Sequence, residues 1–216
     1  MIKNTSSTKP LKKILGIDTA TPETVIAVND ALKTWQSDRN QTNELLPAID
    51  KLLTKLALKP IQLDGVVVNL GPGSFTGLRV GVTVANGFGY GLGLPVAGMD
   101  QFSLIEKLCP KSDVVLIAAG RDEVFFKARS AEPKMIKVAN LSKSIKSGDI
   151  VCVDDYRLIP EIHEQLSSAG TIELINLTRQ ERMEAMLRFA KLPKRFSQVL
   201  PVYVRGANIT KPKPKR

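Results

Sequence analysis

The sequence predicts an α/β protein built from two lobes. From residue 14 to residue 108, short β-branched runs alternate with longer segments of helical spacing, in the order β-β-β-α-β-α. A second, β-rich half with two predicted helices follows a break at residues 109–113. A chain of 216 residues is long enough for one large or two small domains with their own hydrophobic cores.

The two ends of the chain differ in composition from the rest. Residues 1–10 are polar and hold no apolar run that could serve as a signal peptide, so we expect a flexible leader. Residues 206–216 end in K-P-K-P-K-R, which cannot pack into a core and predicts a disordered basic tail. We therefore expect a first lobe at residues 11–108 and a smaller second lobe at residues 109–205, whose last strand could also return to the first lobe.

The first lobe begins with three predicted strands, in which a hairpin turn at Asn29-Asp30 joins the second to the third. An amphipathic helix is predicted at residues 43–58, with Pro47 in its first turn. Asp100 is placed to cap a later helix that ends at Leu108. The predicted strands of this lobe are residues 14–17, 24–28, 32–36, 66–68 and 94–97.

The segment from Gly65 to Met99 predicts a buried strand, a tight turn and a helix that Ser74 or Thr76 can cap. Small residues recur at every fourth position of this helix and leave a strip almost free of side chains. Glycine inside a helix costs about 0.5–1 kcal/mol relative to alanine, so the strip predicts a close contact. That contact is either with the chain's own sheet or with a helix of another chain. The strip consists of Gly77, Gly81, Ala85, Gly89 and Gly93.

Residues 80–99 carry no charge, yet we do not expect them to cross a membrane, because they include six glycines, Asn86 and Pro95. The second lobe is predicted to contain a helix that begins with a capping box of Thr178 and Glu181. Its other predicted elements are strands at 114–119, 123–129, 134–138, 150–153, 172–175 and 201–205, and a helix at 159–166.

The net charge and the cysteine content indicate which partners and which cell compartment to expect. A formal net charge of +10 suits an anionic partner such as nucleic acid, although a basic proteome or surface solubility produces the same charge. Cys109 and Cys152 form no C-x-x-C pattern, so neither a disulfide framework nor a zinc site is indicated. We expect a cytoplasmic protein.

Two segments are candidates for binding a phosphate or a nucleotide. Asp18, followed by Thr19 and Thr21, either presents a carboxylate and hydroxyls to a phosphate-bound metal or caps its own turn. Gly71, Gly73 and Ser74 lie in a loop before a helix, where backbone N–H groups attract anions. The loop matches neither the P-loop nor the G-x-G-x-x-G pattern.

Histidine chemistry is limited to one residue. His163 is the sole histidine, which excludes a metal site of several histidines and argues against a histidine-based nucleophile. The residues indicate no catalytic group and no metal ligand, although metal binding by carboxylates alone, or magnesium held through a nucleotide, stays open.

Five segments in the same order resemble the TsaB (YeaZ) family of bacterial proteins. They are I-L-G-I-D-T-A-T, E-L-L-P, G-P-G-S-F-T-G-L-R-V-G, L-P-V-A-G and P-V-Y-V-R. The resemblance implies a two-lobed actin/sugar-kinase/Hsp70-like (ASKHA) fold with a reduced second lobe. It also implies a role in making threonylcarbamoyladenosine at position 37 of tRNAs that read ANN codons.

In that family the protein is a non-catalytic subunit, which pairs with the paralogue TsaD and is joined by the ATPase TsaE. The resemblance therefore implies ATP and metal on the partner subunits and no cofactor on this chain. Two departures favour a scaffold over an enzyme: a histidine before L-L-P is replaced by Thr42-Asn43-Glu44, and an Asp-Ala-Arg turn by Ala118-Ala119-Gly120.

In the family the pairing surface is a helical bundle of the first lobe, which maps onto residues 43–58 and 77–91. A homodimer is expected when the partner is absent, and no membrane contact is expected. The candidate interface residues are Leu45, Ile49, Leu52, Gly77, Arg79, Val80, Gly81, Val84, Ala85 and Phe88.

Two further functions stay open. The first is an ATP-dependent small-molecule kinase that uses Asp18 and the loop at residues 71–74. The second is RNA binding, through a cluster that includes Arg179 and Arg182 and through the tail, which within the complex would contact tRNA. The candidate tRNA contacts are Arg205, Lys211, Lys213, Lys215 and Arg216.

Overall fold

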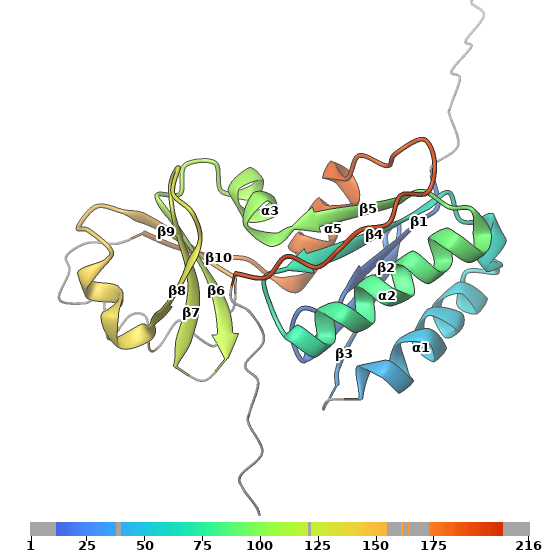
Figure 1. The fold of residues 1–216 in the computed structure, drawn as a ribbon, viewed down its shortest axis with the longest axis horizontal. Helices are drawn as coiled ribbons and strands as arrows, with labels where there is room; N and C mark the ends of the chain where they lie inside the picture. Colours follow the sequence, from blue (N-terminus) through green and yellow to red (C-terminus); the bar gives the residue numbers. More distant parts are fainter. Residues whose placement is uncertain are drawn as a thin grey trace, which may run out of the picture.

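The computed structural model describes residues 12–37, 40–120, 122–154, 161, 164 and 173–204. Two lobes lie side by side, each built on its own sheet (Figure 1). The predicted leader, the basic tail and most of the predicted helix at residues 159–166 lie outside the described residues.

The first sheet has the strand order β3-β2-β1-β4-β5. Its first three strands form an antiparallel meander, and β4 and β5 add to β1 in parallel. The predicted turn is present, with Asn29 at a positive φ of 52° between β2 and β3. The strands are β1 (Ile14–Asp18), β2 (Glu23–Val28), β3 (Ala31–Gln36), β4 (Gly65–Gly71) and β5 (Val96–Asp100).

Helices cover both faces of this sheet (Figure 1). On one face, α1 (Gln41–Lys55) and α2 (Phe75–Leu92) pack against the sheet, and on the other α3 (Gln101–Leu108) and α5 (Arg179–Phe189) do so. The structure corrects one detail of α1. Because the helix begins at Gln41, Pro47 lies inside it and not in its first turn.

The second sheet has the order β10-β9-β6-β7-β8. Read from the β8 edge and numbered within its own lobe, this is third-second-first-fourth-fifth, with the same parallel and antiparallel pairings as in the first sheet. The two lobes thus repeat one topology that the sequence does not reveal. The strands are β6 (Val114–Gly120), β7 (Glu123–Ala128), β8 (Lys134–Lys137), β9 (Ile150–Val153) and β10 (Glu173–Asn176), and the short 3-10 helices are η1 (Pro60–Gln62) and η2 (Val138–Lys143).

Helix α3 joins the two lobes (Figure 1). Its Leu104 packs with buried residues of the first sheet, whereas Phe102, Ile105 and the following Cys109 pack with residues of the second sheet. The side chain of Asp100 accepts a hydrogen bond from Ser103 N at 2.8 Å, as predicted for a helix cap. One short helix therefore contributes to the cores of both lobes.

The C-terminal part returns to the first lobe earlier than predicted. Helix α5 buries Met183 and Met186 against the first sheet, so the second lobe does not extend to residue 205. The predicted strand at residues 201–205 is also wrong, because residues 201–204 form no regular strand. Val202 N nevertheless donates a hydrogen bond to Leu70 O at 2.8 Å and ties this segment to the end of β4.

Candidate functional site

A buried polar cluster lies where the lobes meet. Asp18 ends β1, Asn69 lies in β4, Gln101 begins α3 and Asp154 follows β9. Asn69 Nδ2 donates to Asp18 Oδ1 at 3.0 Å and to Gln101 Oε1 at 3.2 Å, and Gln101 Nε2 donates to Asp154 Oδ2. A chain of hydrogen bonds therefore connects a carboxylate of the first lobe to a carboxylate of the second.

Two arginines of α5 complete this cluster. Arg182, whose side chain is 1% exposed, pairs with Asp154 Oδ1 and reaches Asp18 Oδ2 at 3.8 Å. Arg179 lies 3.9 Å from Asp154 Oδ2 and 3.3 Å from Glu23 Oε2. A buried charge without a partner is strongly destabilising, so these cations and carboxylates stabilise one another. The cluster links both lobes through charge.

Asp18 also caps its own turn, as one of the two interpretations predicted. Its Oδ1 accepts a hydrogen bond from Ala20 N at 3.0 Å. Its carboxylate is thus bound by Ala20, Asn69 and Arg182, all from this chain. This arrangement favours a structural role for Asp18.

The loop at residues 71–74 lies beside Asp18, but its donors serve the chain itself. Gly71 N donates to Asn69 Oδ1 at 2.8 Å, and Ser74 N donates to Ala20 O at 2.7 Å. Ser74 Oγ caps α2 by accepting from Gly77 N, so Ser74 is the cap and not Thr76. A Cβ at Gly73 would overlap Ala20, which shows how closely the turn after β1 covers the loop. These contacts do not favour phosphate binding.

Four residues of the glycine strip pack against the chain's own first lobe, whereas Gly93 follows α2 in a left-handed conformation and has no contact of this kind. A Cβ at Gly77 or Gly81 would overlap Thr19, and a Cβ at Gly89 would overlap Phe196 and Val96. Thr19 Oγ1 also donates to Gly77 O at 2.7 Å. The interpretation of this strip as a contact with another chain is therefore wrong for Gly77, Gly81 and the fully buried Ala85.

The same correction applies to three candidates on α1. Leu45, Ile49 and Leu52 are buried in the core between α1 and the first sheet, so they are not available to a partner. Their helical spacing indicated an apolar face correctly, but the sheet covers that face.

The opposite face of α2 is open. Arg79 is exposed, whereas Val80, Val84 and Phe88 are half-buried and pack against the core of the first lobe. Apart from the adjoining residues and the backbone of α2 itself, no heavy atom of the described residues lies within 4 Å of the position that a Cβ would take at Gly87 or Gly91. Tyr90 is 85% exposed on this helix, and Leu46 of α1 is 51% exposed. We call Leu46, Gly87, Tyr90 and Gly91 the open helical face.

The segment at residues 196–204 runs along α2 (Figure 1, red). Asn86 Nδ2 donates to Val199 O at 2.9 Å, and Val199 N donates to Asn86 Oδ1 at 3.1 Å. Arg79 Nε donates to Tyr203 OH at 3.3 Å. Leu200 remains 68% exposed, so the segment adds an apolar residue beside α2. The P-V-Y-V-R motif signalled this segment, but its place on α2 was not predicted.

The family model described as "TsaD: tRNA N6-adenosine threonylcarbamoyltransferase" matches residues 35–153, more than half of the chain. The chain is 34% identical over 95 residues to the tRNA threonylcarbamoyladenosine biosynthesis protein TsaB of Haemophilus influenzae. The aligned region covers 42% of this chain and 40% of that protein. The chain belongs to the TsaB (YeaZ) family. This confirms the resemblance carried by the five motifs.

Other relatives of this TsaB-family chain match it over part of their length. An uncharacterised protein of Mycobacterium tuberculosis is 33% identical over 123 residues, covering 54% of this chain and 58% of that protein. TsaB of Escherichia coli is 34% identical over 91 residues, covering 40% of this chain and 39% of that protein. The chain thus matches about half the length of these curated relatives.

Solved structures show the same fold. YeaZ from Pseudomonas aeruginosa superposes with a TM-score of 0.62 and 18% identity, covering 89% of this TsaB-family chain and all (100%) of that structure. With the two matching sheet topologies, this confirms the predicted two-lobed ASKHA-like α/β fold.

Sequence reasoning missed Gln101 and Asp154 and misplaced the two arginines. Arg179 and Arg182 were assigned to a basic surface for RNA, but their side chains are 11% and 1% exposed. The sequence places both arginines in the first turns of a capped helix, and this was the available signal. It could not identify their carboxylate partners, because these lie far away in the sequence. Among the described residues, no group of three or more His, Cys, Asp or Glu side chains could hold a metal ion.

The remaining expectations concern charge and membranes. All five candidate tRNA contacts, Arg205 to Arg216, lie outside the described residues, as does His163. In the part of the chain that the structure describes, no helix combines the length and the apolar character needed to span a membrane.

Proposed function

We propose that this chain is a non-catalytic partner subunit of a tRNA threonylcarbamoyl transferase complex. It pairs with a TsaD-like paralogue for the modification of position 37 in tRNAs that read ANN codons, and a TsaE-like ATPase joins them. Membership of the TsaB (YeaZ) family supports a role in the threonylcarbamoyladenosine modification of tRNA. The observation that carries the non-catalytic role is Arg182, which is buried between Asp18 and Asp154.

A kinase on this fold would need a carboxylate free to hold a magnesium-bound phosphate. Asp18 is the candidate, but Arg182 lies opposite it and Asn69 and Ala20 donate to it. A metal ion at Asp18 would have to displace Arg182 and leave that cation buried without its partner, which is strongly unfavourable. The kinase alternative therefore has less support than the scaffold.

The open helical face is the proposed contact with the paralogue. Gly87 and Gly91 are four residues apart and share one side of α2, so a partner helix can approach the backbone closely there. Tyr90 of α2 and Leu46 of α1 supply exposed apolar area on the two helices that cover the same face of the first sheet. Exposed aromatic side chains are frequent anchors of protein interfaces. In the absence of the paralogue, a second copy of this chain would cover the face as a homodimer.

The test is analytical ultracentrifugation of the chain alone and mixed with the TsaD-like paralogue of the same organism. We expect a heterodimer that replaces any homodimer. Gly87→Trp should lower the affinity of the pair at least tenfold without unfolding the chain, because no atom occupies the space at Gly87. Glu184→Trp, at an exposed position of α5, is the control and should leave the affinity unchanged.

Two results would count against the proposal. If the two proteins do not associate, the chain is not a partner subunit of this transferase. If the isolated chain hydrolyses ATP and Asp18→Asn abolishes the turnover, the kinase alternative is correct. Deletion of residues 206–216 tests the tail separately: tRNA affinity of the complex should fall, and its salt dependence should become less steep.

A further inference from the structure

The chain contains only two cysteines, and the fold brings them together. Cys109 follows the last turn of α3, and Cys152 lies in β9, the strand next to the centre of the second sheet. Their sulfur atoms are 2.6 Å apart, although the residues are separated by 43 positions in the sequence. Both are free thiols and both are buried.

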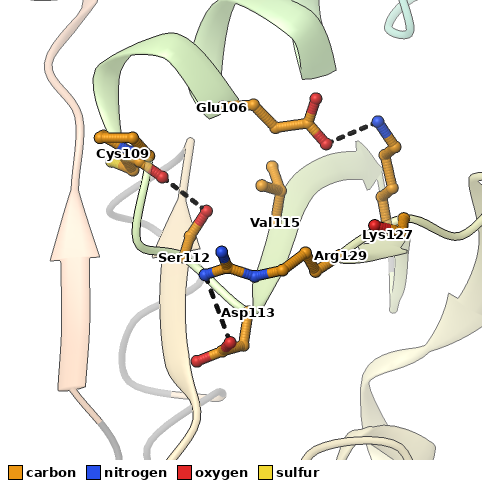
Figure 2. A pocket seen from close by; sticks show the side chains of 9 residues that line it. Glu106, Cys109, Ser112, Asp113, Val115, Lys127 and Arg129 are labelled. Atoms are coloured by element: carbon orange, nitrogen blue, oxygen red, sulfur yellow. Dashed lines mark hydrogen bonds and ion pairs between the residues drawn. The ribbon is translucent and has the colours of Figure 1, made fainter.

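Of the two cysteines, Cys109 lines a pocket beside the end of α3. Figure 2 shows this pocket, of about 310 Å³, between the end of α3 and strands β6 and β7. Cys109 lines it together with Ser112, whose hydroxyl donates to Cys109 O at 2.8 Å. Cys152 does not line it and is fully buried, in contact with Cys109. A reagent in the pocket therefore meets Cys109 first.

Two cations also line the pocket (Figure 2). Lys127 pairs with Glu106 at 2.5 Å, and Arg129 lies 3.3 Å from Asp113. Both pairs are at the surface, with side chains between 20% and 53% exposed. Exposed pairs contribute only about 0–1 kcal/mol, so a ligand with its own carboxylates can compete for these cations.

The chemistry of the thiols agrees with this order of access. The contact with Cys152 lowers the pKa of the Cys109 thiol. The same contact, together with burial, raises the pKa of the Cys152 thiol. The thiolate is the nucleophile in thiol–disulfide exchange. Cys109 is thus the thiol better suited to react first.

We propose that Cys109 and Cys152 form a modification site, at which a small carboxylate-bearing disulfide such as oxidised glutathione converts the two thiols into an intramolecular disulfide. The Cys109 thiolate attacks one sulfur of the reagent, forms a mixed disulfide and releases one glutathione thiolate. Cys152 then loses its proton to solvent and attacks Cys109 Sγ, which releases the second glutathione. Two protein thiols are oxidised, and one disulfide is reduced to two thiols.

The link would have a structural consequence. It would fix the end of α3, the helix that contributes to both cores, to the second sheet. It would also close a loop between two residues 43 positions apart and so restrict the unfolded chain. Oxidation is therefore expected to raise the thermal unfolding temperature and to stiffen the junction between the lobes.

The experiment equilibrates the full chain with oxidised and reduced glutathione, blocks the remaining thiols under denaturing conditions, and counts them by mass spectrometry. We expect free thiols to fall from two to none, with a cross-linked peptide that contains Cys109 and Cys152 and a higher Tm. Reduction should reverse all three changes. These measurements use the unaltered protein, so their outcome does not depend on whether a variant folds correctly.

Two variants test the order of the steps. In Cys152→Ala, the mixed disulfide at Cys109 should accumulate, because no second thiol resolves it. In Cys109→Ala, the native protein should not react at Cys152. The proposal is overturned if both thiols of the unaltered protein persist under oxidised glutathione, or if oxidation links separate molecules. It is also overturned if glutathione stays attached to both cysteines.

Discussion

Replacement of Arg182 by methionine tests the charge cluster that joins the lobes. Methionine keeps much of the volume of the side chain but removes the cation, so the buried carboxylates of Asp18 and Asp154 lose a partner. Removing one member of a buried ion pair typically destabilises a protein by about 3–5 kcal/mol. Arg182 is 1% exposed and Asp154 is fully buried. The range therefore applies without the reduction for solvent screening that an exposed ion pair requires.

Urea unfolding measures this loss. The chain contains one tryptophan, Trp35, in β3 of the first lobe, and its fluorescence can be compared with far-UV circular dichroism. We expect Arg182→Met to lower the free energy of unfolding by about 3–5 kcal/mol. Arg188→Met on the same helix is the control: Arg188 is exposed and should change stability by only about 0.5 kcal/mol.

A double variant separates charge from packing. If the loss arises from the unpaired carboxylate, Asp154→Leu added to Arg182→Met should recover part of it, since an apolar replacement of a whole buried pair is often neutral. A loss of less than about 1 kcal/mol in the single variant, or no recovery in the double variant, would refute the role of Arg182 as the partner of these carboxylates.

Three other predictions concern the first lobe. Gly77→Ala should destabilise the chain because its Cβ would overlap Thr19, whereas Gly87→Ala should stabilise it by about 0.5–1 kcal/mol; thermal melting distinguishes the two. Hydrogen bonds from Ser37 and Trp35 lower the pKa of Glu44 below its ordinary 4.5. Glu44 therefore contributes stability above pH 4.5 that is lost as the pH falls through its folded pKa. Urea unfolding at several pH values should show that Glu44→Gln makes the stability less dependent on acid. Asn86→Ala removes both hydrogen bonds to Val199 and should lower the free energy of unfolding by about 1–3 kcal/mol; amide exchange at Val199 should become faster.

Much of the secondary structure could be predicted because its signals are local. The capping box of Thr178 and Glu181 is present as expected, with Glu181 N donating to Thr178 Oγ1 at 3.2 Å. The capping residue and the residue it binds are three positions apart, so their chemistry is visible in the sequence. Strand β4 and helix α2 were indicated for the same reason, by a β-branched run, a tight turn and a helical period.

The candidate site was predicted less well, because its interactions join distant parts of the chain. The glycine strip indicated that something approaches α2 closely, but glycine spacing does not say whether the neighbour is Thr19 of the same chain or another molecule. Arg182 looked like a surface cation, since arginine is usually exposed. Its burial became evident only when the fold placed α5 against Asp18 and Asp154.

The sequence by itself determined most of the elements, several of their caps, the apolar faces and the family of this protein, because each depends on residues near one another or on an ordered set of motifs. Only the tertiary structure decided which faces are covered, that both lobes repeat one strand order, and that Cys109 meets Cys152. Those contacts follow from the path of the chain between elements, and neither hydrophobic periodicity nor local hydrogen bonding encodes that path over tens of residues.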